Sequence, residues 1–156
     1  MEFNIDAIRA VLQYIKDNTK YENDTRIEKA YLIQGDIVKG VPESDKYTSN
    51  DIAYSIELLL DTDLIKLLAS PTYLPSGQLR LVKISRLTIE GYSFLEKTQN
   101  PTIWEAVKNR AKAVGEFSLK GVCGIATTLG TAMLKDPYAL DNFIKGTKHI
   151  VNMVCH

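Results

Sequence analysis

The sequence predicts a mainly helical α+β protein, and three observations lead to this fold class. Apolar residues recur at helical spacing in several segments, two short apolar stretches flank a loop with Pro and Gly, and turn-forming residues separate these segments. The 156 residues are 45% apolar and 24% charged, which is the composition of a globular protein with a hydrophobic core. Disorder and a fibrous structure are therefore not expected.

The first helix is expected over residues 5–18. Asn4 is placed to cap it, and Phe3 and Ile8 are placed to form a hydrophobic staple across that cap. The apolar positions that repeat at helical spacing are Ile5, Ile8, Leu12 and Ile15. Residues 30–38 are apolar and β-branched around a Gly35-Asp36 turn signal, which predicts short strands.

A second helix is expected to begin after Thr48, because Asp51 lies three residues later, as in a capping box. Its apolar face consists of Ile52, Ile56, Leu59 and Leu60. Residues 64–68 and 79–84 predict two antiparallel strands joined by a long loop. The turn-forming residues of that loop are Pro71, Pro75 and Ser76-Gly77.

Helical signals continue beyond the predicted hairpin. Thr88 is placed to cap a third helix through Leu95, with Leu87 and Tyr92 as its staple, and Asn100-Pro101 is placed to start a fourth. The apolar positions of the fourth and fifth helices are Ile103, Val107, Ala111 and Val114, then Val122, Ile125, Leu129 and Met133. A sixth helix is expected after Asp136, which precedes Pro137.

The fifth helix contains Gly121, Gly124 and Gly130, and a glycine in a helix interior costs about 1 kcal/mol relative to alanine. Close packing against another helix would compensate for that cost. The packing partner is either the sixth helix of the same chain or the fifth helix of a second copy, which would make a homodimer through the C-terminal helices.

Helix, strand, helix, β-hairpin and further helices is the element order of a winged helix, here with a C-terminal helical extension. We therefore expect a winged-helix-like core over residues 1–100 and a helical extension over residues 101–156, packed on the core as a single domain. No internal repeat, low-complexity tract or linker interrupts the chain.

The expected location is the cytoplasm. Residues 1–6 carry no basic apolar leader, and no stretch reaches the roughly 18 uncharged apolar residues that span a bilayer. Cys123 and Cys155 are the only cysteines, so a disulfide framework is not expected. The net charge is zero, and the segment sums are −2 for residues 1–46, −4 for 47–65, +5 for 66–120 and +1 for the remainder. A polyanion would meet the middle of the chain.

Two segments carry a family resemblance. Ser49-Asn-Asp-Ile-Ala-Tyr-Ser-Ile-Glu-Leu-Leu-Leu60 and Leu87-Thr-Ile-Glu-Gly-Tyr-Ser-Phe-Leu95, followed by Trp104, resemble an uncharacterised family of phages and prophages that is named only as a domain of unknown function. The resemblance covers residues 5–134 and implies a Leu-Thr-x-x-Gly-His-x-Phe-Leu motif. This chain has Tyr92 in place of that His, Ile89 where the family often has Trp, and Ser55 where another His is common. The resemblance implies a winged helix, a mobile-element origin and a host-cell cytoplasm, but no activity.

A catalytic function is not expected. The only histidines, His149 and His156, lie far from any Ser or Cys nucleophile pattern, and no phosphate-binding glycine loop occurs. Those histidines with the two cysteines are ligand types for zinc, but no Cys-x-x-Cys spacing pre-organises them. We therefore expect no enzyme activity, no cofactor, no metal and no small-molecule substrate, and we expect Trp104 to lie in the core.

Two non-catalytic functions remain open. In the first, the protein is a winged-helix regulator of transcription that binds duplex DNA, with the hairpin on phosphates and the preceding helix in the major groove. The residues expected to contact DNA are Arg80, Lys83, Arg86 and Lys66 in and around the hairpin, and Asn50, Tyr54 and Ser55 on the helix.

In the second, the protein is a protein-binding module that inhibits a host factor such as a nuclease-based antiviral defence. Carboxylates at the end of the helix before the hairpin would oppose DNA phosphates, whereas they suit a protein surface of opposite charge. The residues expected to contact the partner are Tyr54, Glu57, Asp61 and Asp63. The winged-helix order favours the first function, and the local charge favours the second.

Overall fold

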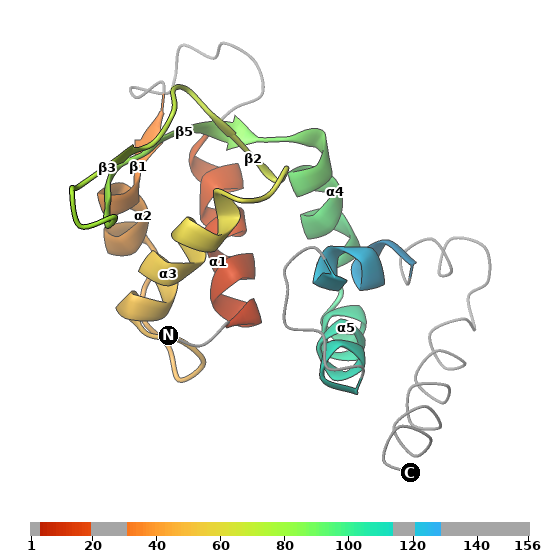
Figure 1. The fold of residues 1–156 in the computed structure, drawn as a ribbon. Coiled ribbons are helices and arrows are strands. Elements are labelled where there is room, and N and C mark those ends of the chain that lie inside the picture. Colours follow the sequence, from red (N-terminus) through yellow and green to blue (C-terminus); the bar gives the residue numbers. More distant parts are fainter. Residues whose placement is uncertain (1–3, 20–30, 114–120, 129–156) are drawn as a thin grey trace. The chain divides into compact units, whose positions relative to one another are not determined.

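The chain has a mixed α+β fold, mainly helical, with small antiparallel sheets (Figure 1). The computed structural model describes residues 4–19, 31–113 and 121–128. The chain divides into two units, Met1–Tyr92 and Ser93–His156, and each unit is described by itself.

The first unit begins with helix α1 (Ile5–Asn18), and the predicted helix and cap are confirmed. Asn4 Oδ1 accepts a hydrogen bond from the Ala7 amide at 3.0 Å, while Asn4 Nδ2 donates to the Lys46 carbonyl at 2.9 Å. One side chain therefore caps the helix and also holds its start against the loop that precedes the next long helix. The proposed staple partner, Phe3, lies outside the described residues.

The prediction of strands over residues 30–38 is wrong beyond the first few residues. Strand β1 covers only Leu32–Ile33, and Gln34–Gly40 forms a short helix, α2. Asp36 Oδ2 accepts from the Ile33 amide at 3.1 Å, so the Gly35-Asp36 signal starts a helix instead of reversing a strand. Ile37 is fully buried and fixes the helix to the core.

Helix α3 (Ser49–Leu59) starts with the predicted capping box. Thr48 Oγ1 accepts from the Asp51 amide at 3.3 Å, and Asp51 Oδ2 accepts from the Thr48 amide at 2.9 Å. Its buried face is made of Ile52, Ser55, Ile56 and Leu59.

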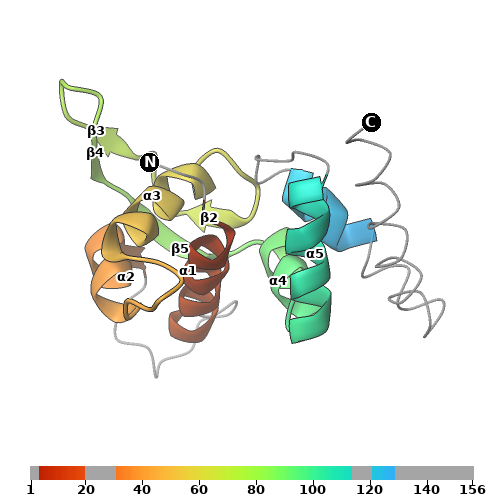
Figure 2. The same cartoon turned by 90° about the horizontal axis from the view of Figure 1, so that it is seen from below.

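The remaining strands of this unit are β2 (Ile65–Leu67), β3 (Thr72–Tyr73), β4 (Leu79–Leu81) and β5 (Lys83–Leu87). One antiparallel sheet has the order β1-β5-β2, and β3 pairs with β4 in a separate two-stranded ribbon. The predicted strand over residues 64–68 is confirmed, but the strand predicted over 79–84 is right only in part: residues 79–81 pair with β3, and the partner of β2 is β5, residues 83–87. Helices α1, α2 and α3 lie on one side of the three-stranded sheet, and the hairpin projects beyond them (Figures 1 and 2).

The core of this unit lies between those helices and the inner face of the sheet. Its largest fully buried side chains are Ile8, Leu12, Ile15, Ile37, Ile52, Ile56, Leu59, Ile84 and Leu87. The burial of aliphatic side chains from three helices and strand β5 in one cluster is the main stabilising contribution to this unit.

Helix α4 (Ile89–Lys97) crosses the boundary between the units, and α5 (Pro101–Ala113) belongs to the second unit. The predicted helix starts are confirmed: Thr88 Oγ1 accepts from the Gly91 amide at 3.1 Å, and Asn100 Oδ1 accepts from the Thr102 amide at 2.8 Å. Trp104 is buried and packs edge-to-face on Phe94 with ring centroids 6.1 Å apart.

Residues 121–128 are helical, as expected for the start of the glycine-containing helix. The predicted sixth helix, Gly130 and the helix packing proposed for them lie outside the described residues. Within the described parts of the chain, no helix is long and apolar enough to cross a membrane.

Candidate functional site

The outer face of the three-stranded sheet is basic. On the inner face, Ile65 of β2 lies opposite Leu87 of β5, and both are buried. The next pair, Lys66 and Arg86, must therefore lie on the outer face, because successive side chains of a strand alternate. Lys83 lies between the buried Val82 and Ile84 and is on the outer face for the same reason. We call Lys66, Lys83 and Arg86 the basic sheet face.

A β-bulge brings Arg86 to this face. Lys66 pairs with Arg86, but the next residue of β2, Leu67, pairs with Ile84, so Ser85 is an extra residue in β5. Regular pairing would place Arg86 on the same face as Ile84, two residues away, and therefore in the core. The bulge keeps Ile84 and Leu87 buried while Arg86 is directed outward.

The cations of the basic sheet face have defined contacts. Lys83 Nζ lies 5.1 Å from the ring centroid of Tyr31, which is cation–π distance. Arg86 is half-buried and donates from Nη1 to the Leu87 carbonyl at 3.3 Å. Lys66 is exposed and, as the direct neighbour of Arg86 across the strands, adds a like charge that favours binding of an anion between them.

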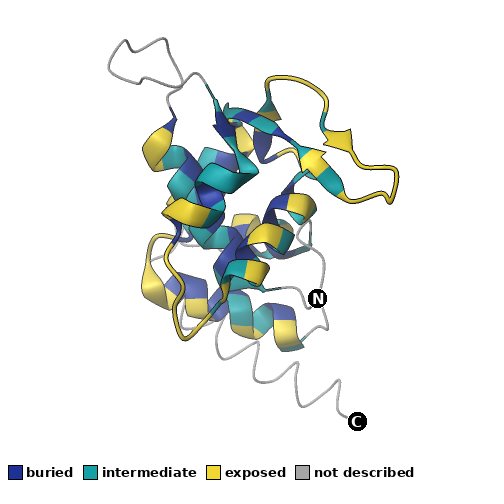
Figure 3. Cartoon of the chain, turned by 90° about the vertical axis from the view of Figure 1, so that its left-hand side faces the viewer, coloured by how far each residue is buried: buried dark blue, intermediate teal, exposed yellow. Residues whose placement is uncertain are grey.

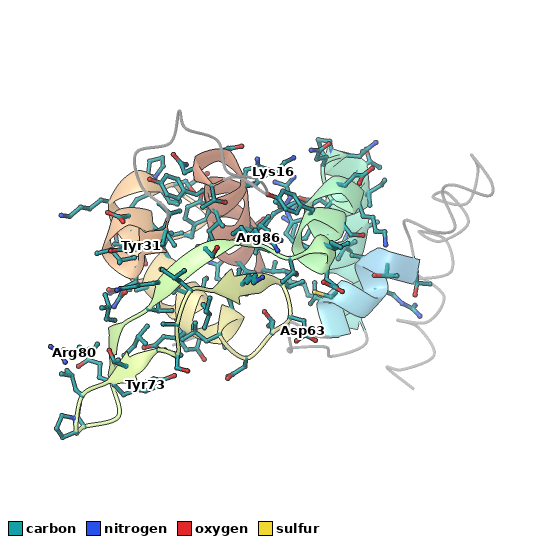
Figure 4. All side chains as sticks on the ribbon, turned by 90° about the horizontal axis from the view of Figure 1, so that it is seen from above. Lys16, Tyr31, Asp63, Tyr73, Arg80 and Arg86 are labelled. Carbon is teal, nitrogen blue, oxygen red and sulfur yellow. The ribbon has the colours of Figure 1, made fainter. Side chains whose placement is uncertain are left out.

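The hairpin projects from the edge of this face. Tyr73 pairs with Leu79 and Thr72 pairs with Leu81, so the exposed Arg80 is an extra residue in β4. Figure 4 shows Arg80 and Tyr73 together on the hairpin, with Asp63 at the other end of the sheet. The turn is closed by hydrogen bonds from the Leu74 amide to the Gln78 carbonyl and from the Gly77 amide to the Leu74 carbonyl, both at 2.8 Å.

Gln34 fixes the base of the hairpin. Its Nε2 donates to the Arg80 carbonyl at 2.8 Å, and its Oε1 accepts from the Val82 amide at 3.0 Å. The side-chain amide of the first residue of α2 thus pairs with the backbone at the junction of β4 and β5 as a neighbouring strand would.

Large apolar side chains are exposed on the hairpin and in the segment that leads into it. Leu68 is 54% exposed, Tyr73 55% and Leu74 41%, and the ribbon around them is among the most exposed parts of the unit (Figure 3). Residues 67–79 carry no charged side chain, and the whole stretch from residue 64 to residue 89 carries no carboxylate. The charged residues of that stretch are Lys66, Arg80, Lys83 and Arg86. We call Tyr73 and Leu74 the apolar tip, whereas Leu68 follows β2 and its amide donates to the Lys83 carbonyl of β5 at 2.9 Å.

Helix α3 presents a different surface. Asn50 and Glu57 are exposed and Tyr54 is half-buried, while Asp61 and Asp63 are exposed just beyond the helix end. The prediction that Ser55 faces outward is wrong: Ser55 is 1% exposed, and its hydroxyl donates to the Asp51 carbonyl at 2.7 Å. Its position one turn after Asp51 and next to Ile56 puts it on the buried face of the helix.

The residues predicted to contact DNA therefore fall on two surfaces. Lys66, Lys83 and Arg86 share the outer face of the sheet, with Arg80 on the hairpin beside it. Asn50 and Tyr54 lie on α3, which packs on the opposite, inner side of the sheet. The residues of the alternative protein interface, Tyr54, Glu57, Asp61 and Asp63, stay together on α3 and the turn that follows it.

Sequence reasoning missed the contributions of Tyr31, Gln34 and the apolar tip. The contacts of Tyr31 and Gln34 join residues about fifty positions apart, which no local pattern records. The apolar tip had a signal, since a hairpin loop with apolar residues and no charge is unusual for a solvated loop.

The residues that carry the family resemblance have structural roles. Leu87 is buried, Thr88 caps α4 and donates from Oγ1 to the Asp63 carbonyl, and the Thr88 amide donates to the Leu64 carbonyl at 3.0 Å. A Cβ on Gly91 would overlap the Leu64 carbonyl oxygen. These contacts join the start of α4 to the turn before β2.

No metal site is formed among the described residues. They contain no group of three or more His, Cys, Asp or Glu side chains that could hold a metal ion. Burial raises the pKa of the Cys123 thiol to about 11, so it is protonated and unreactive near neutral pH. His149, Cys155 and His156 lie outside the described residues.

A comparison with protein families gives one match, to a family described as hypothetical protein (DUF2513), over residues 2–117. No curated protein and no solved structure matches the chain.

Proposed function

This chain belongs to the DUF2513 family, whose description names no activity, and we propose that it is a non-catalytic DNA-binding regulator that contacts duplex DNA through its hairpin and basic sheet face. The proposed setting is the cytoplasm of a bacterial host, with the gene carried by a phage or prophage. No cofactor or small-molecule substrate is required for this function.

The element order of the first unit, which is the order expected of a winged helix, supports the proposal. The elements run α1, β1, α2, α3, β2, hairpin, β5, and the first and last strands pair with each other while the last also pairs with β2. In a winged helix the hairpin is the wing, and α3 would take the place of the recognition helix. Many such domains bind DNA, but a fold alone does not assign a function. The function must therefore be argued from the residues on the surface.

The observation that carries the proposal is the charge of residues 64–89. This stretch has four cations and no carboxylate, and three of the cations share the outer face of the sheet. Phosphate contacts supply most of the sequence-independent affinity for DNA, and a carboxylate in the interface would oppose them. The absence of any acid over the whole ribbon matches a polyanion better than a mixed-charge protein surface.

Helix α3 is not the recognition element in this proposal. The carboxylates Glu57, Asp61 and Asp63 are exposed on it and just after it, and the side chain expected to read bases beside Tyr54, Ser55, is buried. A helix with this surface would place negative charge against phosphates. The wing therefore makes the DNA contacts, and α3 faces away from the duplex.

The test is fluorescence anisotropy of a labelled mixed-sequence duplex at about 50 mM and about 200 mM salt, since the slope of log affinity against log salt counts phosphate contacts. The variant Lys66→Ala/Arg80→Ala removes two exposed cations and is expected to fold normally. Its salt slope should fall by about 2 relative to the unsubstituted protein.

The matched control is Lys39→Ala/Lys46→Ala, which removes two exposed cations from α2 and from the loop before α3. It changes the net charge equally and should leave the slope unchanged. Equal losses in the two variants would mean that only net charge matters, and no binding at the lower salt would overturn the function.

A second candidate function rests on the cluster formed by Tyr54, Glu57, Asp61 and Asp63. An aromatic side chain beside exposed carboxylates fits a basic protein surface, such as the nucleic-acid channel of a host defence nuclease. In this alternative the protein inhibits that host factor. Its test is a pull-down from host lysate, in which Glu57→Gln/Asp61→Asn/Asp63→Asn loses a partner that Lys66→Ala/Arg80→Ala retains.

A further inference from the structure

We propose that the apolar tip of the β3–β4 hairpin enters the minor groove of the bound duplex and wedges between base pairs, so that binding bends the DNA. This inference rests on the DNA-binding function proposed above and names what the hairpin does there.

The first support is exposure. Tyr73 and Leu74 on the hairpin are both large and apolar, and they are 55% and 41% exposed. Exposed apolar groups clustered on one projecting element indicate a binding surface, because such surface gains free energy when it leaves water. The occupant must therefore offer apolar surface to a narrow ribbon.

The second support is the charge around the tip. The nearest charged residues on either side of the uncharged stretch are Lys66 and Arg80, both exposed and both cationic. A partner that offers apolar surface between two lines of negative charge is a nucleic-acid duplex, in which the base stack lies between two phosphate backbones. Leu and Pro are among the side chains that enter base steps from the minor groove, and Leu74-Pro75 occupies the turn.

The third support is the fixed base of the hairpin. Gln34 holds the Arg80 carbonyl and the Val82 amide at 2.8 and 3.0 Å, and the turn is closed by two further backbone hydrogen bonds. A ribbon that is held in place before binding loses little conformational freedom when it is pressed into a groove. The base and the turn of the hairpin are thus both held in place before DNA is bound.

The test measures DNA bending by energy transfer between dyes at the two ends of a short duplex, together with the anisotropy salt series. The intact protein should increase the transfer efficiency on binding. Leu74→Ala should lose that increase and bind several-fold more weakly while keeping the same salt slope, because its phosphate contacts remain.

The matched control is Ile89→Ala, which truncates an apolar side chain that is 68% exposed but lies outside the hairpin. It should bend and bind DNA like the unsubstituted protein. Binding without any increase in energy transfer would overturn the wedge and leave the DNA-binding function intact, whereas no binding at low salt would overturn both.

Sedimentation of the free protein tests a second copy as the occupant of the tip. A dimer that Leu74→Ala converts to a monomer would overturn the wedge in favour of self-association. A monomer in both proteins, together with the loss of bending in the variant, supports it.

Discussion

Gly91 lies where the start of α4 meets the turn before β2. Thr88 ties these segments with hydrogen bonds to the carbonyls of Asp63 and Leu64, and the backbone at residue 91 lies so close to Leu64 that a side chain does not fit. The contact is with a backbone carbonyl, which cannot rotate away as a flexible side chain could. The φ of Gly91 is in the ordinary range, so backbone conformation does not require a glycine here. The lack of space for a side chain does.

Gly91→Ala should therefore destabilise the protein by about 2–3 kcal/mol through overpacking. The measurement is the free energy of unfolding in urea. Gly124→Ala is the control, because Gly124 is exposed in a helix and nothing lies within 4 Å of an added Cβ. It should stabilise by about 0.5–1 kcal/mol, since alanine is the better helix former. A neutral effect of Gly91→Ala would contradict the close approach described here.

At the scale of the element, capping residues account for most of what the sequence could predict. Asn4, Thr48, Thr88 and Asn100 each accept the amide hydrogen bonds expected of them, so the starts of four helices follow from local chemistry. Such contacts span two or three residues, so they can be recognised in the sequence.

Helix α2 and the β3–β4 hairpin could not be predicted in this way, although Asp36 accepts a hydrogen bond from the Ile33 amide at the start of α2. Helix α2 has seven residues and follows Ile33, whose side chain cannot cap, so its formation depends on the burial of Ile37 in the core. The hairpin strands have two and three residues, which is too short for alternation to be seen. The candidate site could also be predicted only in part. The basic residues could be identified from the sequence, but their separation from α3 follows from the pairing of β2 with β5, which the sequence does not show.

The Gln34 bridge makes a prediction about the hairpin as an element. Gln34→Ala should lower the free energy of unfolding by about 1 kcal/mol, as expected for two partly exposed hydrogen bonds. The Val82 amide should also exchange with solvent faster in native-state hydrogen exchange, because its acceptor is lost.

Gln13→Ala is the control for that experiment, because Gln13 also makes a side-chain hydrogen bond, to Asp17, but at the surface of α1. It should leave the exchange of Val82 unchanged. Equal exchange of Val82 in the Gln34 variant and the intact protein would show that the β4–β5 junction does not depend on this side chain.

At the scale of the whole molecule, a net charge of zero conceals an unequal distribution. The cations of residues 64–89 lie on the outer face of the sheet and on the hairpin, while the exposed carboxylates Glu57, Asp61 and Asp63 lie on α3 and in the turn that follows it. With a Debye length of about 8–10 Å near physiological salt, a duplex on one surface is largely screened from charges on another.

The variant Glu57→Gln/Asp61→Asn/Asp63→Asn should consequently tighten DNA binding only a few-fold at about 50 mM salt and leave it unchanged at about 200 mM. Asp17→Asn/Asp45→Asn/Glu96→Gln adds the same net charge from exposed positions elsewhere and should have the same small effect. A much larger gain for the α3 variant, persisting at the higher salt in anisotropy titrations, would mean that α3 faces the phosphates.

The extra residue in β5 also determines where this chain tolerates a change of length. Deleting Ser85 would leave Ile84, Arg86 and Leu87 in regular alternation, opposite the same residues of β2 and with the same faces buried. Deletion of any other residue of β5 would either have to be absorbed by a shift of the bulge, or it would turn the neighbouring side chains to the opposite face of the sheet. Relatives one residue shorter in this strand should therefore carry their gap at Ser85, and a variant of this protein that lacks Ser85 should still fold with Arg86 on the outer face of the sheet.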